Sequence, residues 1–443
     1  MRGISVSIVI RCLLITFLIC VIQKKETSAR GEHSEVLDLG SLIREAVEKN
    51  PSIIAARNKW LSAQEFVEAQ RGLPDPQISY TYFVKNVETR VGPQRHIFSA
   101  KQKFPFYGKR DLKAEIATRE ANAHEAAYNA TKQEIVRQVR RTFYSLFYVT
   151  KAMEITRSEK VILQRFERIA RTKYETGKGS QQNILKVQVE ISKVDDRLLG
   201  LANQKQTAEA ILNTLVDHPA DRPLGIPAQP KFRDFFYIKP ALFRMAKQNR
   251  PELRAGIALI KKSEGAYNLA RKNYYPDLTI GANYIEIDDG PLPVSDNGQD
   301  AFNVMLSINL PIWRNKLSSQ VGSATQTIAA RKRSYQGLLN RTLFEVKDTY
   351  FKIQTARETF SLYKNVLIPQ AEQSLKSAEA GYITGTVSFL DLLDAERILL
   401  KIGFGYWKSY TDYLTHIADI ERAVGMELAE YPPEDIPPEV EED

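Results

Sequence analysis

The sequence has little cysteine and no long hydrophobic run beyond its first residues. Only Cys12 and Cys20 occur among 443 residues, so the rest of the chain has no thiol for a disulfide, a Cys-based zinc site or a nucleophile. Beyond residue 22, charged residues cut every apolar stretch before it reaches about 18 residues. This pattern excludes a protein that crosses a membrane with several helices.

Histidine and phosphate-binding glycine motifs are also scarce. The five histidines are scattered, without the HExxH spacing of a zinc hydrolase. Gly177-Lys178-Gly179 and Gly403-Phe404-Gly405 lack the remaining glycines and the spacing of nucleotide-binding loops. The number of Asp and Glu residues is, by itself, compatible with a pair of carboxylates that catalyses hydrolysis. We expect no enzyme, no metal site and no cofactor.

The N-terminus has the features of an export signal. Arg2 and Arg11 precede an apolar core, and small residues up to Ala29 suit cleavage by signal peptidase. Residues 1–29 are therefore interpreted as a cleaved signal peptide, with an uncleaved anchor helix as the alternative. Lipidation at Cys20 is a weaker alternative, because a bulky Ile precedes this cysteine.

The net charge of +9 does not form a basic patch. Lys and Arg alternate with Asp and Glu along helical stretches, which is typical of solvated helix faces and predicts no nucleic acid partner. Residues 429–443 are acidic and rich in proline, and indicate an extended tail without a core.

The sequence contains an internal repeat with two copies. Asn50-Pro51 and Pro76 return 200 positions later as Arg250-Pro251 and Pro276. Near the end of each copy, Tyr-x-Thr-Gly at 174–177 returns 208 positions later. We divide the chain into a first repeat at 30–216, a proline-rich connecting belt at 217–240 and a second repeat at 241–428.

Each copy is predicted to contain a helix, two strands and a long helical hairpin. In the first copy, apolar spacing indicates one helix over Leu39–Arg71. Alternation with period 2 predicts strands over the following four ranges: 76–88, 95–104, 277–287 and 302–310.

The hairpins are predicted at 109–216 and 314–428. Lys109–Thr176 contains neither proline nor glycine and would form a helix roughly 100 Å long. Such a rod must pack against other long helices, and Ser180 and Ser388 are expected to cap the returning helices. Pro369 predicts a kink or a short break near Leu367.

These features together resemble the TolC family of outer membrane efflux proteins. The most specific segments are Ile368–Ala371 and Tyr382–Glu396, which are similar to the second hairpin tip of the family. Asn50-Pro51 and the stretch Gln102–Arg110 are similar to its other recurrent segments, and look closest to the CzcC-like branch that serves heavy-metal cation exporters.

The resemblance implies a homotrimer in the outer membrane of a diderm bacterium, with a large periplasmic part. Four strands from each chain would close a 12-stranded barrel in outer membrane lipid, continued by an α-helical tunnel. The implied function is a passive conduit from an inner membrane pump and a periplasmic adaptor to the exterior, with the resistance-nodulation-division pumps as a candidate type. Independently, four strands cannot close a barrel alone, and lipid does not tolerate open edges.

The resemblance also assigns candidate site residues. Two hairpin tips would contact the adaptor: Thr176, Gly177, Lys178, Gly179 and Ser180, and Thr384, Gly385, Thr386, Val387 and Ser388. The periplasmic aperture would be formed by Tyr382, Asp391, Asp394 and Asn183. Tyr107 and Trp313 would lie at the membrane interface.

Simpler interpretations accompany two of these assignments. Asp391 and Asp394 share a helix face in the first turns of the returning helix, where carboxylates also stabilise a helix N-terminus. Tyr107 and Trp313 also fit ordinary packing aromatics. The alternative for the whole chain is a periplasmic coiled-coil scaffold or adaptor, although its two equivalent hairpins fit an adaptor poorly.

Overall fold

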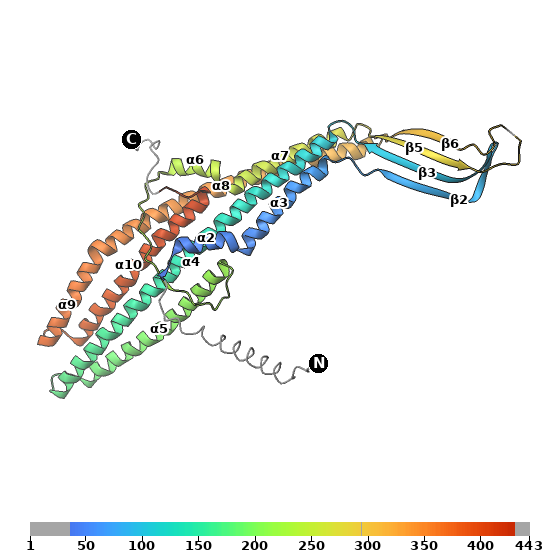
Figure 1. The fold of residues 1–443 in the computed structure, drawn as a ribbon. Coiled ribbons are helices and arrows are strands. Elements are labelled where there is room, and N and C mark those ends of the chain that lie inside the picture. Colours follow the sequence, from blue (N-terminus) through green and yellow to red (C-terminus); the bar gives the residue numbers. More distant parts are fainter. Residues whose placement is uncertain (1–35, 294, 430–443) are drawn as a thin grey trace, which may run out of the picture.

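The computed structural model describes residues 36–293 and 295–429, which form an elongated molecule. Long helices run along most of its length, and a sheet of four antiparallel strands extends from one end (Figure 1). The expected signal peptide, residues 1–29, and all but the first residue of the expected acidic tail lie outside the described residues.

The elements occur in the same order twice. The first copy contains helices α2 (Leu39–Lys49) and α3 (Pro51–Arg71), strands β2 (Gln77–Thr89) and β3 (Gly92–Phe104), and helices α4 (Lys109–Glu175) and α5 (Gln181–Leu215). The second contains helices α6 (Lys239–Asn249) and α7 (Pro251–Lys272), strands β5 (Leu278–Ile287) and β6 (Ala301–Ile308), helix α8 (Arg314–Leu362), the π-helical turn η1 (Tyr363–Leu367), and helices α9 (Ile368–Thr384) and α10 (Phe389–Val424). The mainly α, duplicated fold is confirmed.

The expectation of one helix over Leu39–Arg71 is wrong, because the chain turns at Asn50. The Asn50 side chain accepts hydrogen bonds from the backbone N–H groups of Ser52 (3.0 Å) and Ile53 (3.3 Å), and so caps α3. Pro51 occupies the first turn of α3, where a missing N–H costs nothing. The second copy breaks at the equivalent Arg250-Pro251.

A short parallel strand pair links the belt to the start of the first copy. Strand β4 (Ile226–Pro227) pairs with β1 (Val36–Leu37), which precedes the first helix of the chain's described part. Helix α6 already begins at Lys239, so its first two residues lie inside the expected belt.

The long sheet has the order β2-β3-β5-β6, so each copy supplies one hairpin of strands. Its register places four aromatic residues in one row across all four strands. Tyr80 pairs with Phe98, Phe98 with Tyr284, and Tyr284 with Phe302. Strands β2 and β6 are the two outer strands of the sheet.

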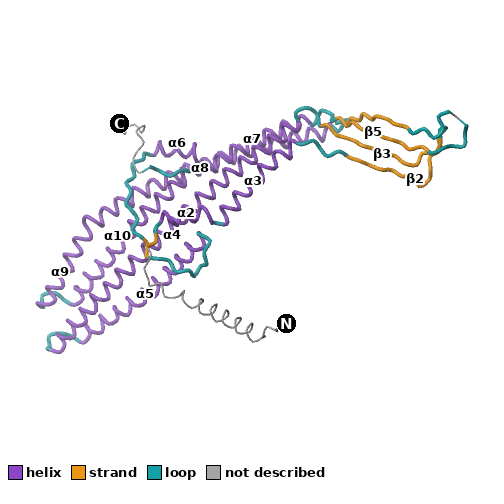
Figure 2. Tube along the Cα trace, viewed as in Figure 1, coloured by secondary structure: helices purple, strands orange, loops and turns teal. Residues whose placement is uncertain are grey.

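The helical hairpins reverse at the end of the molecule opposite the sheet (Figure 2). In the second hairpin the expected irregularity near Leu367 is the π-helical turn η1, which ends one residue before the helical segment containing Pro369. Proline lacks the N–H that an α-helical register would use, so a local change of register at this point has a direct cause.

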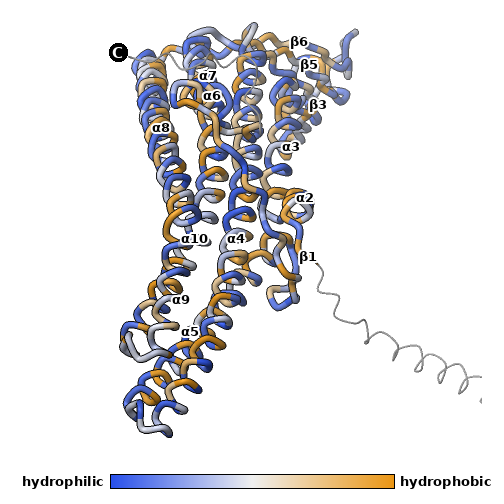
Figure 3. The backbone as a smooth tube through the Cα atoms, turned by 90° about the vertical axis from the view of Figure 1, so that its left-hand side faces the viewer, coloured by the Kyte–Doolittle hydropathy of each residue, from blue (hydrophilic) through white to orange (hydrophobic). Residues whose placement is uncertain are grey.

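The central core draws on equivalent residues of both copies. Leu42 of α2 and Leu242 of α6 are both buried, and they belong to a cluster that includes Phe143 of α4 and Tyr413 of α10. Apolar and polar residues alternate along the long helices (Figure 3). Within residues 36–293 and 295–429, no helix combines the length and the apolar character needed to cross a membrane.

Candidate channel wall and periplasmic aperture

The two faces of the four-stranded sheet differ in chemistry. One face carries the exposed aromatic row Tyr80, Phe98, Tyr284 and Phe302, whose exposed fractions range from 43% to 69%. The neighbouring row on the opposite face is polar and consists of Ser79, Ser99, Asn283 and Asn303. Exposure of such an apolar face to water is unfavourable. The sheet is therefore suited to apolar surroundings on one side and water on the other.

Two members of the polar row are joined by a hydrogen bond. The Asn283 amide donates to the side-chain oxygen of Asn303 at 2.7 Å. On the apolar face, the rings of Tyr80 and Phe98 lie 5.2 Å apart, and those of Phe98 and Tyr284 lie 6.4 Å apart. Cross-strand pairs of these kinds stabilise the observed register, which keeps the two faces distinct.

Tyr107 and Trp313 lie where the strands give way to the long helices. Their exposed fractions are 86% and 72%, so neither packs in a core of this chain. Lys272 donates to the backbone oxygen of Tyr107 at 2.8 Å, and its ammonium lies 5.6 Å from the Tyr107 ring. The exposure argues against the ordinary-packing interpretation within a single chain.

A buried ion pair fixes the same junction. The Lys109 ammonium lies 2.7 Å from Oδ1 of Asp277, and Oδ2 of Asp277 lies 3.1 Å from Lys103. Asp277 also accepts from the backbone N–H of Phe106 at 3.0 Å. One carboxylate thus joins the start of α4, the end of β3 and the start of β5.

The first hairpin tip, residues 176–180, is an exposed turn. Gly177 has a φ of 72°, which glycine adopts without strain, and the Thr176 hydroxyl donates back to the end of α4. Ser180 caps α5 by accepting from the backbone N–H of Gln182 at 3.1 Å.

The second tip, residues 384–388, has the same design. Gly385 has a φ of 90°, and Ser388 begins α10 with a capping box. The backbone N–H of Asp391 donates to the Ser388 hydroxyl at 3.2 Å, and the backbone N–H of Ser388 donates to the Asp391 carboxylate at 3.3 Å. Asp391 is therefore a helix cap in this chain.

Asp394 and the other expected aperture residues lie close to these tips. Asp394 is half exposed and pairs with Arg397 at 3.0 Å, and Arg397 reaches across to Glu190 of α5 at 2.7 Å. Tyr382 is buried, which raises the pKa of its hydroxyl, and the Asn183 side chain partly offsets that rise. The structure thus brings Tyr382 and Asn183 together, and places Asp394 in a charge network rather than alone.

Three links between the two hairpins escaped the sequence argument. The Lys173 ammonium donates to the backbone oxygen of Tyr382, and Arg165 pairs with Glu379 at 2.8 Å. The third link is the Arg397–Glu190 pair. Partners that lie more than 200 positions apart leave no local signal in the sequence.

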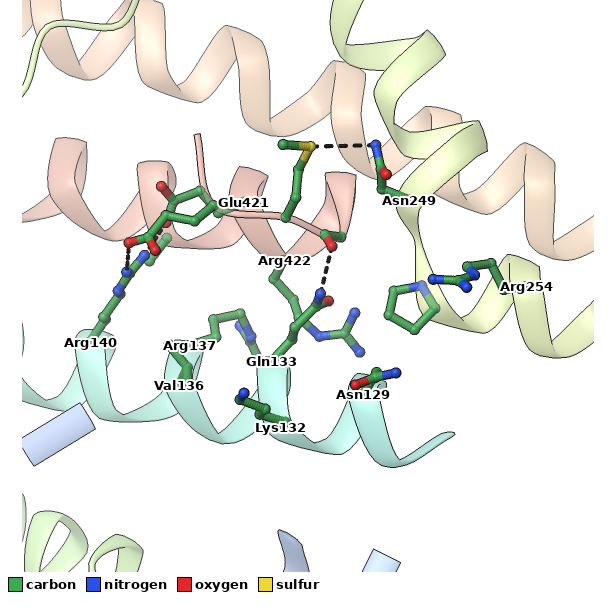
Figure 4. A pocket seen from close by; sticks show the side chains of 15 residues that line it. Asn129, Lys132, Gln133, Val136, Arg137, Arg140, Asn249, Arg254, Glu421 and Arg422 are labelled. Carbon is green, nitrogen blue, oxygen red and sulfur yellow. Dashed lines mark hydrogen bonds and ion pairs between the residues drawn. The ribbon is translucent and has the colours of Figure 1, made fainter. Parts of the chain in front are cut away.

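A cavity of about 500 Å³ lies where α10 ends beside α4 and α7 (Figure 4). Three of the arginines that line it are paired with carboxylates. Arg137 lies 3.0 Å from Asp419, Arg140 pairs with Glu421, and Arg422 pairs with Glu252. In the part of the chain that the structure describes, no group of three or more His, Cys, Asp and Glu residues is arranged to hold a metal ion.

Comparison with known proteins places these features in a family. The family model described as outer membrane efflux protein matches residues 42–217 and 242–402, which is more than half of the chain. The cobalt-zinc-cadmium resistance protein CzcC of Cupriavidus metallidurans is 22% identical over 376 residues, covering 84% of this chain and 85% of that protein. The outer membrane protein TolC of Vibrio cholerae is 20% identical over 399 residues, covering 88% of this chain and 90% of that protein.

A solved structure shows the same fold. The outer membrane protein VceC of Vibrio cholerae aligns with a TM-score of 0.73 and 20% sequence identity, covering 88% of this chain and 96% of that one. The matched segments contain both strand pairs, both hairpin tips and the aromatic junctions described above. The chain belongs to the outer membrane efflux protein family.

Proposed function

We propose that three copies of this chain form a passive efflux conduit across the outer membrane. The observation that carries the proposal is the sheet, which is apolar on one face, polar on the other and unpaired at β2 and β6 within the described chain. Lipid does not tolerate unpaired strand edges. Pairing β6 of one copy with β2 of the next would remove every edge and close a barrel of 12 strands.

The junction residues support the direction of this barrel. Exposed Tyr107 and Trp313 suit the interface between lipid and water, where aromatic residues are enriched. Both lie at the end of the sheet that leads into the long helices. The helical part then lies on the periplasmic side and forms the tunnel.

The hairpin tips are the proposed contact with a periplasmic adaptor. Residues 176–180 and 384–388 are exposed turns built from small residues, at the end of the molecule farthest from the sheet. An adaptor bound there would join the conduit to an inner membrane pump. The resistance-nodulation-division class is the proposed pump type, in keeping with the similarity to CzcC.

The aperture is proposed to lie at the same tips. Three copies would place Asp394 in one ring and Asp391 in another, and carboxylate rings at a narrow entrance favour cations. Asp394 is the stronger filter candidate, because Asp391 is engaged as a helix cap. Tyr382 and Asn183 would hold the neighbouring helices of the two hairpins together.

Cell fractionation with a planar bilayer measurement tests the conduit. The purified protein should come from the outer membrane, have the mass of a trimer and conduct ions. A monomer in the soluble periplasmic fraction would instead support the scaffold or adaptor alternative.

Crosslinking tests the partner. Cysteines at Lys178 or Thr386 should crosslink to an adaptor in cells, and a cysteine at Glu88, in the strand hairpin at the far end of the sheet, is the matched control. Crosslinks formed only at Glu88 would reverse the proposed orientation.

A further inference from the structure

Two carboxyl groups are buried between the hairpins. They belong neither to the hairpin tips nor to the sheet, so the proposed function gives them no role. Glu159 lies on α4 of the first hairpin and is 5% exposed, and Glu396 lies on α10 of the second hairpin and is 4% exposed. Both values refer to one chain, and neighbouring copies in a trimer can only bury these groups further. Burial of an ionised carboxylate is costly unless it is paired.

Within the described part of the chain, only one of the two carboxyls has a direct partner. Arg197 of α5 lies 2.5 Å from Oε2 of Glu159, and its guanidinium lies over the ring of Phe404. The Glu396 side chain makes no hydrogen bond or ion pair with any residue in the described ranges. One arginine therefore faces two buried carboxyls.

The surrounding charges do not supply the missing cation. Glu190 of α5 and Arg397 of α10 act on Glu396 from the edge of the cluster, but they pair with each other at 2.7 Å. Arg397 also holds the exposed Asp394. Lys193 also pairs with Glu190, at 2.9 Å. With Glu159, Glu190, Glu396 and Asp394 all ionised, the four carboxylates face three cations, Arg197, Arg397 and Lys193, so the uptake of one proton balances this group.

The electrostatics identify which carboxyl takes the proton. Burial, together with the like charge of Glu159, raises the pKa of Glu396 to about 8 against the opposing effect of Arg197. Burial also raises the pKa of Glu159, but this carboxyl keeps the hydrogen bond from Arg197. Glu396 is therefore the group that is neutral when the hairpins are packed together.

We propose that Glu396, with Glu159 beside it, is a proton-binding site that stabilises the packed arrangement of the two hairpins. Separation of the hairpins would admit water to Glu396 and lower its affinity for the proton. The proton is thus a ligand of the packed state, and it shifts the equilibrium toward that state. The inference deepens the proposed function in one respect, because it takes the hairpin tips as the aperture.

The sign of the pH dependence follows from the raised pKa. The stabilisation is fully present below the ordinary pKa of a glutamic acid and is lost as the pH rises through the pKa of Glu396 in the packed state. An acidic periplasm therefore favours a closed aperture, and an alkaline one favours separation of the hairpins.

Pulsed spin-label distance measurements between the tips test the site in the full-length trimer. Labels at Lys178→Cys and Thr386→Cys report the separation of the two hairpins, and the chain has no other cysteine beyond residue 20. The short-distance population should decrease as the pH rises, with a midpoint near the pKa of about 8. Glu396→Gln should retain the short distance at every pH, whereas Glu372→Gln, an exposed position on α9, should behave like the wild type.

Glu159→Gln separates a proton site from a packing role. This variant removes the like charge and frees Arg197 for Glu396, so the midpoint should move to lower pH without disappearing. A pH response that is the same in the wild type and in Glu396→Gln would overturn the proposal. At pH 6, the infrared spectrum of the wild type should contain a protonated-carboxyl band that is missing from the spectrum of Glu396→Gln. Absence of this difference would also overturn the proposal.

A conductance measurement distinguishes failure of the proton site from failure of the proposed conduit. Normal ion conduction with tip distances that ignore pH would contradict only the proton site. Tip distances that follow pH, in a protein that conducts at no pH, would contradict only the conduit.

Discussion

Lys173 holds Tyr382 across the gap between the two hairpins. Its ammonium donates a hydrogen bond to the backbone oxygen of Tyr382 and lies 4.5 Å from the centre of the Tyr382 ring. One cation at the end of α4 thus makes both a hydrogen bond and a cation–π contact with the end of α9. Lys173 of the first hairpin thus supplies a charged link that can hold the two hairpins together.

We predict that Lys173→Met loosens the packing of the tips. A hydrogen bond from a charged group contributes about 2 kcal/mol, which corresponds to roughly a 30-fold change in the ratio of separated to packed hairpins. The wild type and the variant are compared by single-channel conductance, where the variant should show a larger open fraction. Lys178→Met, at the exposed turn, is the control and should change little. Equal open fractions in all three proteins would leave Lys173 without a role in closure.

We predict that replacing both Asp391 and Asp394 by Asn lowers the preference of the channel for cations without dispersing the trimer. The carboxylate rings supply the cation preference, while the subunit contacts proposed for the trimer lie along the sheet edges and helices. Reversal potentials in a salt gradient measure the preference. Unchanged selectivity in an assembled double variant would leave the two residues as helix-terminal groups only.

The single variants divide the two roles. Asp391→Asn should destabilise α10 by up to about 1 kcal/mol, because it weakens the capping box with Ser388. Asp394→Asn should carry most of the selectivity loss, since its side chain is half exposed. The reverse assignment of the two effects would contradict the geometry of the tip.

Much of the fold follows from local patterns in the sequence. The alternation of Tyr80 with Ser79 indicates a strand with unlike faces, and the absence of proline and glycine indicates the full length of α4. The repeat predicts that the second copy has the same order of elements. These signals succeed because each depends on near neighbours in the chain.

The remaining features depend on distant partners or on competing local signals. The break at Asn50 was missed because apolar spacing continues through it, although Asn followed by proline is itself a helix-start signal. The contact of Lys173 with Tyr382 and the burial of Glu396 join residues of separate hairpins, which no spacing reveals. The sequence also left two interpretations of Asp391, and only the backbone geometry at Ser388 shows the cap.

We predict that Gly405→Ala destabilises the protein. A Cβ atom at this position would overlap the ring of Tyr363, the first residue of η1, so α10 and η1 would have to move apart. Overpacking of this kind costs about 1–3 kcal/mol. Thermal unfolding of the trimer in detergent measures the effect. A Cβ atom added at Gly337 in α8 would meet no neighbouring group within 4 Å, so Gly337→Ala should stabilise the helix by up to about 1 kcal/mol. The same sign for both changes would contradict the proposed contact.

We predict that Asp277→Asn weakens the junction between the strands and the long helices. Lys109 has a side chain that is 8% exposed, so loss of its carboxylate partner leaves a buried cation uncompensated. The expected cost is about 3 kcal/mol in the free energy of unfolding. Denaturant unfolding measures it, with the exposed pair partner Asp348→Asn in α8 as the control. A cost no larger than that of the control would show that water reaches Lys109 in the assembled protein.

The accessibility of β2 in the reconstituted protein tests whether the sheet faces lipid in an outer membrane channel. Spin labels placed one at a time from Gln77 to Val84 sample both faces of the strand. We predict that label accessibility alternates with period 2 along β2. Oxygen dissolved in lipid should reach labels at Ile78, Tyr80 and Tyr82, and a water-soluble relaxation agent should reach labels at Ser79 and Thr81. Uniform exposure to the water-soluble agent along the whole run would contradict a sheet that faces lipid, and with it the outer membrane channel.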